Sequence, residues 1–169
     1  MYSFAQRDDT RVIDEPLYGH YLRVTSAAHP GREQVMAAMN CDGNAVMQSL
    51  LHPATAPNRP VLFMKHMAHH LVGIDTGFLT ETQNVFLIRD PAEMLPSLTI
   101  QLPNATLADT GLAVQSRLYD ELRSRGQQPA ILDSRKLLLD PEHVLETLCR
   151  HLGIRFDLRM LSWPKGPIP

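Results

Sequence analysis

Short apolar runs bounded by turn-forming or charged residues recur along the chain. Val61–Met64 and Val85–Ile88 are the strongest of these runs, and Ala130–Leu132 repeats the pattern more weakly. A continuous apolar run of this length is typical of a strand that is buried on both faces of a sheet. Thr10–Asp14 is interpreted as a further short strand, which ends before Glu15-Pro16. The pattern therefore predicts strands at these four positions.

Stretches with the period of an α-helix lie between the predicted strands. The clearest is Pro141–Leu152, whose apolar residues share one face and which is followed by Gly153 as a stop. Further helices are expected at residues 1–5, Pro30–Met39, Asn44–Leu51 with Asn44 as the cap, Pro91–Leu98 and Ala108–Arg123. Strands that alternate with amphipathic helices predict an α/β fold, in which a parallel sheet is flanked by helices.

Composition places the chain among ordinary folded proteins. Its 169 residues are enough for one domain, and 44% of them are hydrophobic, which excludes a disordered chain. We therefore expect a single domain over residues 1–169. The net charge of −2 argues against nucleic acid as a partner, and no apolar stretch is long enough for a membrane span. The only two cysteines, Cys41 and Cys149, match no CxxC spacing, which favours reduced thiols and a cytoplasmic protein.

Ionisable residues follow three of the predicted strands. Asp14-Glu15-Pro16 follows the first strand, Lys65-His66 the second and Arg89-Asp90-Pro91 the third. In α/β sheets, ligands bind beyond the carboxyl ends of the strands. The recurrence of charged residues at these ends therefore predicts an active site there.

The third strand end has the features of an anion site. Arg89 leaves the strand, Asp90-Pro91 turn the chain, and Ser97 lies about two turns into the following helix. The start of a helix offers unpaired N–H groups to an anion, and arginine adds a planar fork that suits phosphate oxygens. A structural alternative stays open, in which Arg89 forms a salt bridge with Asp90 or Glu93 and Ser97 is only an exposed helix residue.

Residues 84–98 resemble the second donor-binding motif of sulfotransferases. In that family a strand ends in Arg-Asp/Asn-Pro, and a serine eight residues beyond the arginine joins it in binding the 3′-phosphate of 3′-phosphoadenosine 5′-phosphosulfate (PAPS). Arg89 and Ser97 have this spacing. The Asp140-Pro141-Glu142 helix start and the Leu152-Gly153 helix end extend the resemblance over about residues 84–169. It implies PAPS as co-substrate, no metal, and transfer of a sulfonate group to an acceptor hydroxyl or amine.

The resemblance also implies roles for residues at the first two strand ends. Asp14–Leu17 resembles the bacterial pattern in which an acidic residue is the base, so Glu15 is a candidate base, with a plain turn carboxylate as the alternative. Lys65 is expected to pair with the bridging phosphate oxygen. His66 is a second candidate base, although it directly follows the lysine where cytosolic members have Lys-Thr-His. Helical spacing of His66, His69 and His70 leaves a metal site as an alternative.

The C-terminal segment resembles the loop that covers the donor nucleotide. Lys165, within Ser162–Pro167, is expected to approach the 3′-phosphate, with a polar tail as the alternative. Ser134-Arg135-Lys136 stands where many members have Tyr-Glu-Asp, so the usual contact to adenine is not carried over.

The resemblance implies a P-loop NTPase-like three-layer sandwich, but the Ser/Gly/Arg-rich loop for the 5′-phosphosulfate is missing from this chain. We therefore expect a fold that lacks its first strand and P-loop, from a truncated or degenerate member with little or no turnover. A P-loop-type kinase or hydrolase and a non-catalytic interaction module stay as alternatives. The acceptor is a small molecule or carbohydrate of unspecified kind, and Leu17–Ala28 and Leu102–Thr110 are expected to be loops that face it.

Overall fold

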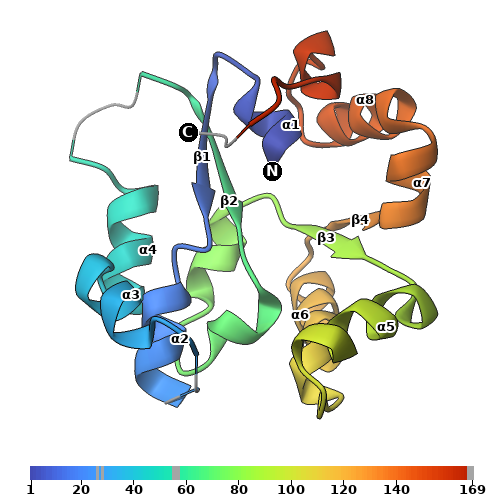
Figure 1. Cartoon of the computed structure of the whole chain (residues 1–169). Helices are drawn as coiled ribbons and strands as arrows, with labels where there is room; N and C mark the ends of the chain where they lie inside the picture. Colours follow the sequence, from blue (N-terminus) through green and yellow to red (C-terminus); the bar gives the residue numbers. More distant parts are fainter. Residues whose placement is uncertain (26, 28, 55–57, 167–169) are drawn as a thin grey trace. The chain divides into compact units, whose positions relative to one another are not determined.

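The structure is a computed structural model that describes residues 1–25, 27, 29–54 and 58–166 (Figure 1). It contains two compact units. The first unit comprises Met1–Phe78 together with Ser162–Pro169, and the second comprises Leu79–Leu161. The expectation of a single domain over residues 1–169 stays a prediction.

The first unit is built on a pair of parallel strands. β1 (Thr10–Asp14) pairs with β2 (Val61–Lys65), and Asp14 lies opposite Lys65 in the register. The short helix α1 (Tyr2–Ala5) precedes β1, and its buried Phe4 stacks on Phe63 of β2 with ring centroids 4.2 Å apart. Burial of these aromatic rings removes apolar surface from water and fixes α1 against the sheet.

Helices complete the first unit. They are α2 (Tyr18–Thr25), α3 (Arg32–Ala38), α4 (Gly43–Leu51) and the single-turn 3₁₀ helices η1 (Ala68–Leu71) and η2 (Gly77–Glu81), the last of which crosses the boundary between the units. Two expectations are wrong here. Most of the expected loop Leu17–Ala28 is helix α2, while Ala28 lies outside the described residues. The cap of α4 is Asp42 and not Asn44, because the Asp42 carboxylate accepts a hydrogen bond from the Ala45 N–H at 3.1 Å.

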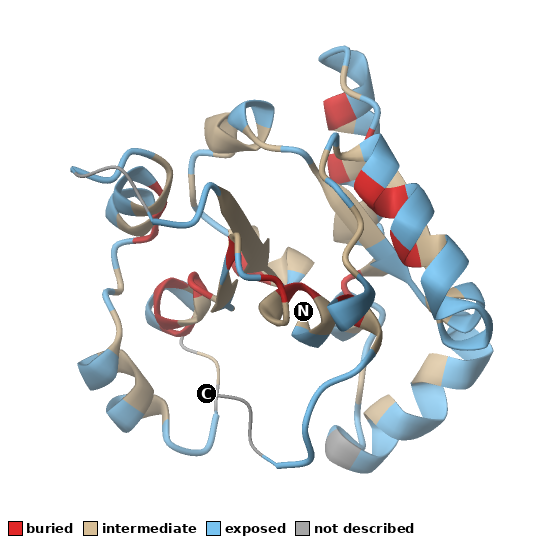
Figure 2. Cartoon of the chain, turned by 90° about the horizontal axis from the view of Figure 1, so that it is seen from above, coloured by how far each residue is buried: buried red, intermediate tan, exposed pale blue. Residues whose placement is uncertain are grey.

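The second unit is built on another parallel pair. β3 (Val85–Ile88) pairs with β4 (Ala130–Asp133), with Ile88 opposite Asp133. The strand order gives two separate two-stranded sheets rather than one continuous sheet. The expectation that the apolar runs are buried on both faces is wrong for β3 and β4, because Leu87 is 54% and Ile131 is 51% exposed. These side chains project from the faces of the sheet, and the flanking helices leave them partly open to solvent. Figure 2 shows the chain coloured by burial, with buried residues in red and exposed residues in pale blue.

Helices also flank the sheet of the second unit. They are α5 (Pro91–Gln101), α6 (Leu112–Ser124), α7 (Ser134–Leu139), α8 (Pro141–His151) and the 3₁₀ helices η3 (Ala108–Thr110) and η4 (Leu158–Leu161). Gly111, at a φ of +69°, separates η3 from α6 within the expected helix Ala108–Arg123. The buried face of α8 confirms the expected periodicity, with Leu145, Leu148 and Cys149 in the core.

The fold is therefore of the α/β class, with small parallel sheets flanked by helices. Within the described residues, no helix has the length and apolar character needed to cross a membrane.

Candidate functional site

The carboxyl ends of β1 and β2 bring together two of the expected site residues. The parallel register places Asp14 opposite Lys65, and the next residue, Glu15, donates its backbone N–H to the Lys65 carbonyl at 2.9 Å. Glu15 has a φ of +45°, in the left-handed region that side chains other than glycine rarely adopt. This conformation turns the chain out of the strand, and the Tyr18 N–H at the start of α2 then bonds to the Glu15 carbonyl at 3.0 Å.

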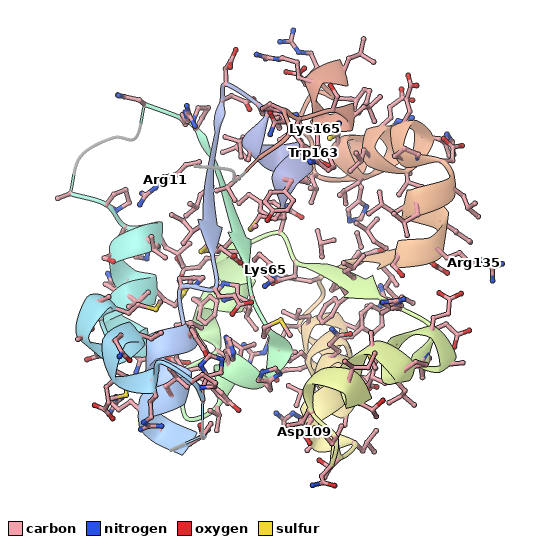
Figure 3. All side chains as sticks on the ribbon, viewed as in Figure 1. Arg11, Lys65, Asp109, Arg135, Trp163 and Lys165 are labelled. Carbon is pink, nitrogen blue, oxygen red and sulfur yellow. The ribbon has the colours of Figure 1, made fainter. Side chains whose placement is uncertain are left out.

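The side chain of Lys65 lies between two carboxylates (Figure 3). Its Nζ forms a hydrogen-bonded ion pair with Glu15 Oε1 and lies 3.4 Å from Asp14 Oδ1. Burial disfavours the charged ammonium, but the hydrogen bond and negative charge of Glu15, assisted by Asp14, outweigh it and raise the pKa of Lys65 above its usual value. Lys65 is therefore a firmly charged cation in a cluster whose formal charge is negative.

His66 directly follows β2 and is shielded from solvent. Both of its ring nitrogens are buried and have no hydrogen-bond partner among the described residues. Burial, opposed by the charge of Glu15 and assisted by that of Lys65, lowers the pKa of His66 to about 4. At neutral pH this imidazole is uncharged, and neither nitrogen is open to solvent.

The neighbouring histidines form an aromatic cluster. His70 is 2% exposed and stacks against Tyr18 and Tyr21 at centroid distances of 5.3 and 4.7 Å, and His69 meets it edge-on at 4.7 Å. Burial, together with nearby His69 and Lys65, lowers the pKa of His70 to about 3. In the part of the chain that the structure describes, no three histidine, cysteine or acidic residues are grouped to hold a metal, so the alternative of a histidine metal site gains no support.

In the second unit, the carboxyl end of β3 exposes the arginine expected to bind phosphate. Arg89 is the first residue after β3 and is solvent-exposed. The next residue, Asp90, caps α5 by accepting the Ala92 N–H at 2.8 Å. Among the described residues Arg89 has no ion-pair partner, which overturns the alternative of a structural salt bridge. Glu93 instead lies 3.9 Å from Arg135.

Ser97 lies on the same helix as this cap, two turns into α5. It is exposed, and its hydroxyl donates to the Met94 carbonyl at 2.9 Å. A serine hydroxyl in this arrangement keeps its two lone pairs and can rotate toward another acceptor. Arg89 and Ser97 thus flank the first two turns of one helix, at the carboxyl end of β3.

The helix that follows the carboxyl end of β4 was not predicted from the sequence. Asp133 ends the strand and caps α7, because its carboxylate accepts the N–H groups of Arg135 and Lys136 at 2.8 and 3.3 Å. An aspartate directly before a polar segment is the signal for a helix start that was overlooked.

Lys165 stays an isolated candidate. It is exposed in an irregular segment near the described C-terminal end, and Pro167 of the expected loop lies outside the described residues (Figure 3). Trp163, two residues earlier, contacts Tyr2 with ring centroids 6.1 Å apart. Within the described residues, no ion pair links Lys165 to Glu15, whose partner is Lys65.

Apart from Lys165, the expected site residues thus fall into two groups, each of which lies within one unit. Glu15, Lys65 and His66 cluster at the end of the first sheet, and Arg89 and Ser97 lie at the end of the second. A family model described as a sulfotransferase domain matches residues 1–168. The chain belongs to the sulfotransferase family. This membership confirms the resemblance seen in the motif around Arg89.

Two relatives from Arabidopsis thaliana are similar to this sulfotransferase domain over its whole length. "Branched-chain-amino-acid aminotransferase-like protein 2" is 37% identical over 171 residues, and "Branched-chain-amino-acid aminotransferase-like protein 1" is 36% identical over 170 residues. The alignment covers 100% of this chain but only 30% of each relative. No solved structure is significantly similar to the chain.

Sequence reasoning missed the contribution of Asp14. Its carboxylate was taken only as part of the motif around Glu15, whereas the structure places it beside Lys65. The strand register that pairs Asp14 with Lys65 was the signal, and it becomes readable only when the two strands are known to be parallel neighbours.

Proposed function

We propose that this sulfotransferase domain transfers a sulfonate group from PAPS to a hydroxyl or amine of a small-molecule or carbohydrate acceptor. The observation that carries the proposal is Arg89, an exposed guanidinium without an ion-pair partner among the described residues, at the start of a capped helix in a chain of this family. A surface arginine without a counter-ion beside a helix N-terminus suits a phosphate group.

Arg89 and Ser97 would hold the 3′-phosphate of the donor. The guanidinium of Arg89 offers two parallel N–H groups, and the Ser97 hydroxyl adds a hydrogen bond to a phosphate oxygen. Lys165, also a cation, is proposed to approach the same phosphate. The donor supplies the activated sulfonate group, and every residue assigned here serves to bind it, to neutralise charge or to move a proton.

Accessibility favours Glu15 over His66 as the base. The Glu15 side chain is 27% exposed, whereas both His66 nitrogens are buried and the pKa of His66 is lowered to about 4. A general base must come within hydrogen-bond distance of the proton that it removes. The partly exposed Glu15 carboxylate can be reached by an acceptor once it turns from Lys65, whereas the His66 nitrogens would first have to be uncovered.

The proposed reaction is an in-line displacement at sulfur. The acceptor oxygen or nitrogen forms a bond to sulfur while the bond from sulfur to the bridging phosphate oxygen breaks. Glu15 takes the acceptor proton, and the ammonium of Lys65 stabilises the negative charge that develops on the departing phosphate. No residue of this scheme requires a metal.

We propose that the protein acts in the cytoplasm. Support comes from the spacing of the two cysteines, since Cys41 and Cys149 match no CxxC pattern, which favours reduced thiols. The aminotransferase-like names belong to proteins of which this chain matches 30%, and they do not specify the activity of the matched segment.

Binding of adenosine 3′,5′-bisphosphate, the nucleotide product of PAPS, tests the proposal by calorimetry. Arg89→Ala should weaken binding by about tenfold or more, the value of a charge-assisted hydrogen-bond pair. Arg117→Ala removes an exposed arginine from α6 in the same unit and should leave binding unchanged.

Adenosine 5′-monophosphate provides the matched ligand, because it lacks the 3′-phosphate. Its affinity should be the same for the unaltered chain and for Arg89→Ala. The absence of bisphosphate binding to both proteins would contradict the proposal and favour a non-catalytic module, and tighter binding of ATP than of the bisphosphate would favour a kinase or hydrolase.

A further inference from the structure

We infer that Glu15 and the donor phosphate compete for Lys65, so that donor binding releases the Glu15 carboxylate to act as the base. The inference rests on the proposed function and adds an order of events to it. It assigns Glu15 an effect on donor affinity that acts through Lys65.

In the structure Lys65 already has carboxylate partners. Its ammonium, the cation proposed for the departing phosphate, is hydrogen-bonded to Glu15 and lies 3.4 Å from Asp14. Two carboxylates face one ammonium, so this cluster carries a formal charge of −1. An anionic donor that approached the intact cluster would be repelled rather than attracted, because the two carboxylate charges exceed the charge of Lys65.

The lengths of the two acidic side chains indicate which carboxylate leaves. Asp14 is the last residue of β1 and is fixed opposite Lys65 by the parallel ladder. Glu15 follows the last paired residue and still donates its backbone N–H to the Lys65 carbonyl at 2.9 Å, in a left-handed conformation that residues with a Cβ rarely adopt. The Glu15 side chain is one methylene longer than that of Asp14, so it can turn away from Lys65 Nζ while both backbones stay in place. Asp14, 3.4 Å from Nζ, then keeps a negative charge beside the ammonium, and a phosphate oxygen can take the position of the Glu15 carboxylate.

Exchange of partners has a chemical consequence for Glu15. The Glu15 oxygen that is hydrogen-bonded to Lys65 Nζ is not free to accept a hydrogen bond from an acceptor hydroxyl or amine. When Lys65 turns to the phosphate, the Glu15 carboxylate loses its counter-ion and becomes available to the acceptor. The competition thus keeps the base blocked until the donor is bound, which limits proton removal in an incomplete complex.

A double-mutant cycle on adenosine 3′,5′-bisphosphate binding tests this competition. Glu15→Gln removes the competing charge and should tighten binding about fivefold, the upper range for a partly exposed ion pair. In a Lys65→Met background the same substitution should change the affinity by less than about twofold, because the contested cation is gone. Glu33→Gln removes an exposed carboxylate from α3 in the same unit and should leave binding unchanged.

The lysine side chains give a second readout that does not depend on activity. The chain contains only three lysines, so ¹⁵N signals of their ammonium groups are readily assigned. Titration with the bisphosphate should shift the Lys65 signal in the unaltered chain. Glu15→Gln alone, without nucleotide, should also shift it, which shows that the ion pair exists in solution.

The outcomes separate the inference from the proposed function. If Arg89→Ala weakens binding but Glu15→Gln leaves it unchanged or weakens it, competition for Lys65 is refuted and the proposed function stands. Equal tightening by Glu15→Gln with and without Lys65 would also refute the competition, since simple charge repulsion then explains the effect. If the unaltered chain binds no bisphosphate, both the proposed function and the inference fail.

Discussion

Two histidines of the first unit, His66 and His70, have buried ring nitrogens without a hydrogen-bond partner among the described residues, and they make the stability of the unit sensitive to mild acid. His70 lies stacked between Tyr18 and Tyr21, and its buried Nδ1 has no hydrogen-bond partner among the described residues. His66 has no such partner for either nitrogen. Burial lowers the pKa of His70 to about 3 and that of His66 to about 4, whereas both rings regain a pKa near 6.5 in the unfolded chain.

These pKa values determine the direction in which stability changes with pH. Above pH 6.5 both histidines are neutral in the folded and unfolded chains, and stability is fully retained. As the pH falls from 6.5 toward the folded values near 4 and 3, the unfolded chain binds protons that the folded chain excludes, and stability is lost. At pH 5 the linkage relation gives a loss of about 2 kcal/mol for each histidine, or about 4 kcal/mol for both, relative to pH 8.

Urea denaturation followed by circular dichroism at pH 8, 6.5 and 5 measures this loss. His70→Phe keeps a ring that stacks on the two tyrosines but cannot be protonated, so it should reduce the loss of unfolding free energy between pH 8 and 5 by about 2 kcal/mol. His143→Gln, at an exposed position of α8, is the matched control and should leave the loss unchanged.

The reasoning would be refuted if His70→Phe lost as much stability between pH 8 and 5 as the unaltered chain. In that case His70 would be open to solvent protons while the protein stays folded. A variant that does not fold at pH 8 would point to strict packing of the cluster, and the His66→Leu variant then supplies the same test for the second histidine.

Two further substitutions test the packing of each unit. Gly43→Ala would place a Cβ 2.8 Å from Cγ of the buried His20, so we expect a loss of about 1–3 kcal/mol of unfolding free energy, and an unchanged melting temperature would contradict this close approach. Asn84→Ala removes side-chain hydrogen bonds to the Leu79 carbonyl at 2.7 Å and to Gln127 at 2.8 Å and should cost about 2 kcal/mol, with a less than additive effect when it is combined with Gln127→Ala.

The positions of the strands could be predicted from the sequence, because the residues of each strand indicate a strand without reference to the rest of the fold. Thr10–Asp14 and Val85–Ile88 form strands at the expected bounds, and the apolar run at Val61 extends by one residue to Lys65. Short apolar runs between turn residues leave few other ways to bury their side chains. The burial of the strand side chains could not be predicted, since it depends on what packs against the two faces of each sheet.

Helix α2 was missed because its buried face is not apolar. Its buried residues include Gly19 and His20 besides Leu22, so no hydrophobic period is visible. The His20 ring is satisfied by the Val72 carbonyl at 2.8 Å and by the Gly43 N–H at 3.3 Å, both from segments more than 20 residues away. Tertiary hydrogen bonds of this kind leave no trace in a local pattern.

The candidate site was only partly readable for the same reason. The rule that ligands bind at strand carboxyl ends pointed to Glu15, Lys65 and Arg89, and the structure places all three at such ends. It did not indicate that Lys65 is already paired with Glu15, because that contact joins residues 50 positions apart. The alternative of a salt bridge between Arg89 and Asp90 or Glu93 is not realised, because Asp90 caps α5 and Glu93 lies beside Arg135.

The two interpretations of Glu15, as a plain turn residue and as the base, can be compared by their effects on stability. A residue needed only for the turn at φ +45° would be better served by glycine or asparagine, since a left-handed conformation costs other residues about 1–2 kcal/mol. The partly exposed ion pair with Lys65 contributes about 1 kcal/mol or less to the free energy of unfolding. The two contributions leave no clear gain in stability, so the turn and the ion pair together do not account for a glutamate here. The role proposed for Glu15 accounts for it, because a carboxylate that is to leave Lys65 and accept a proton has to be held only weakly.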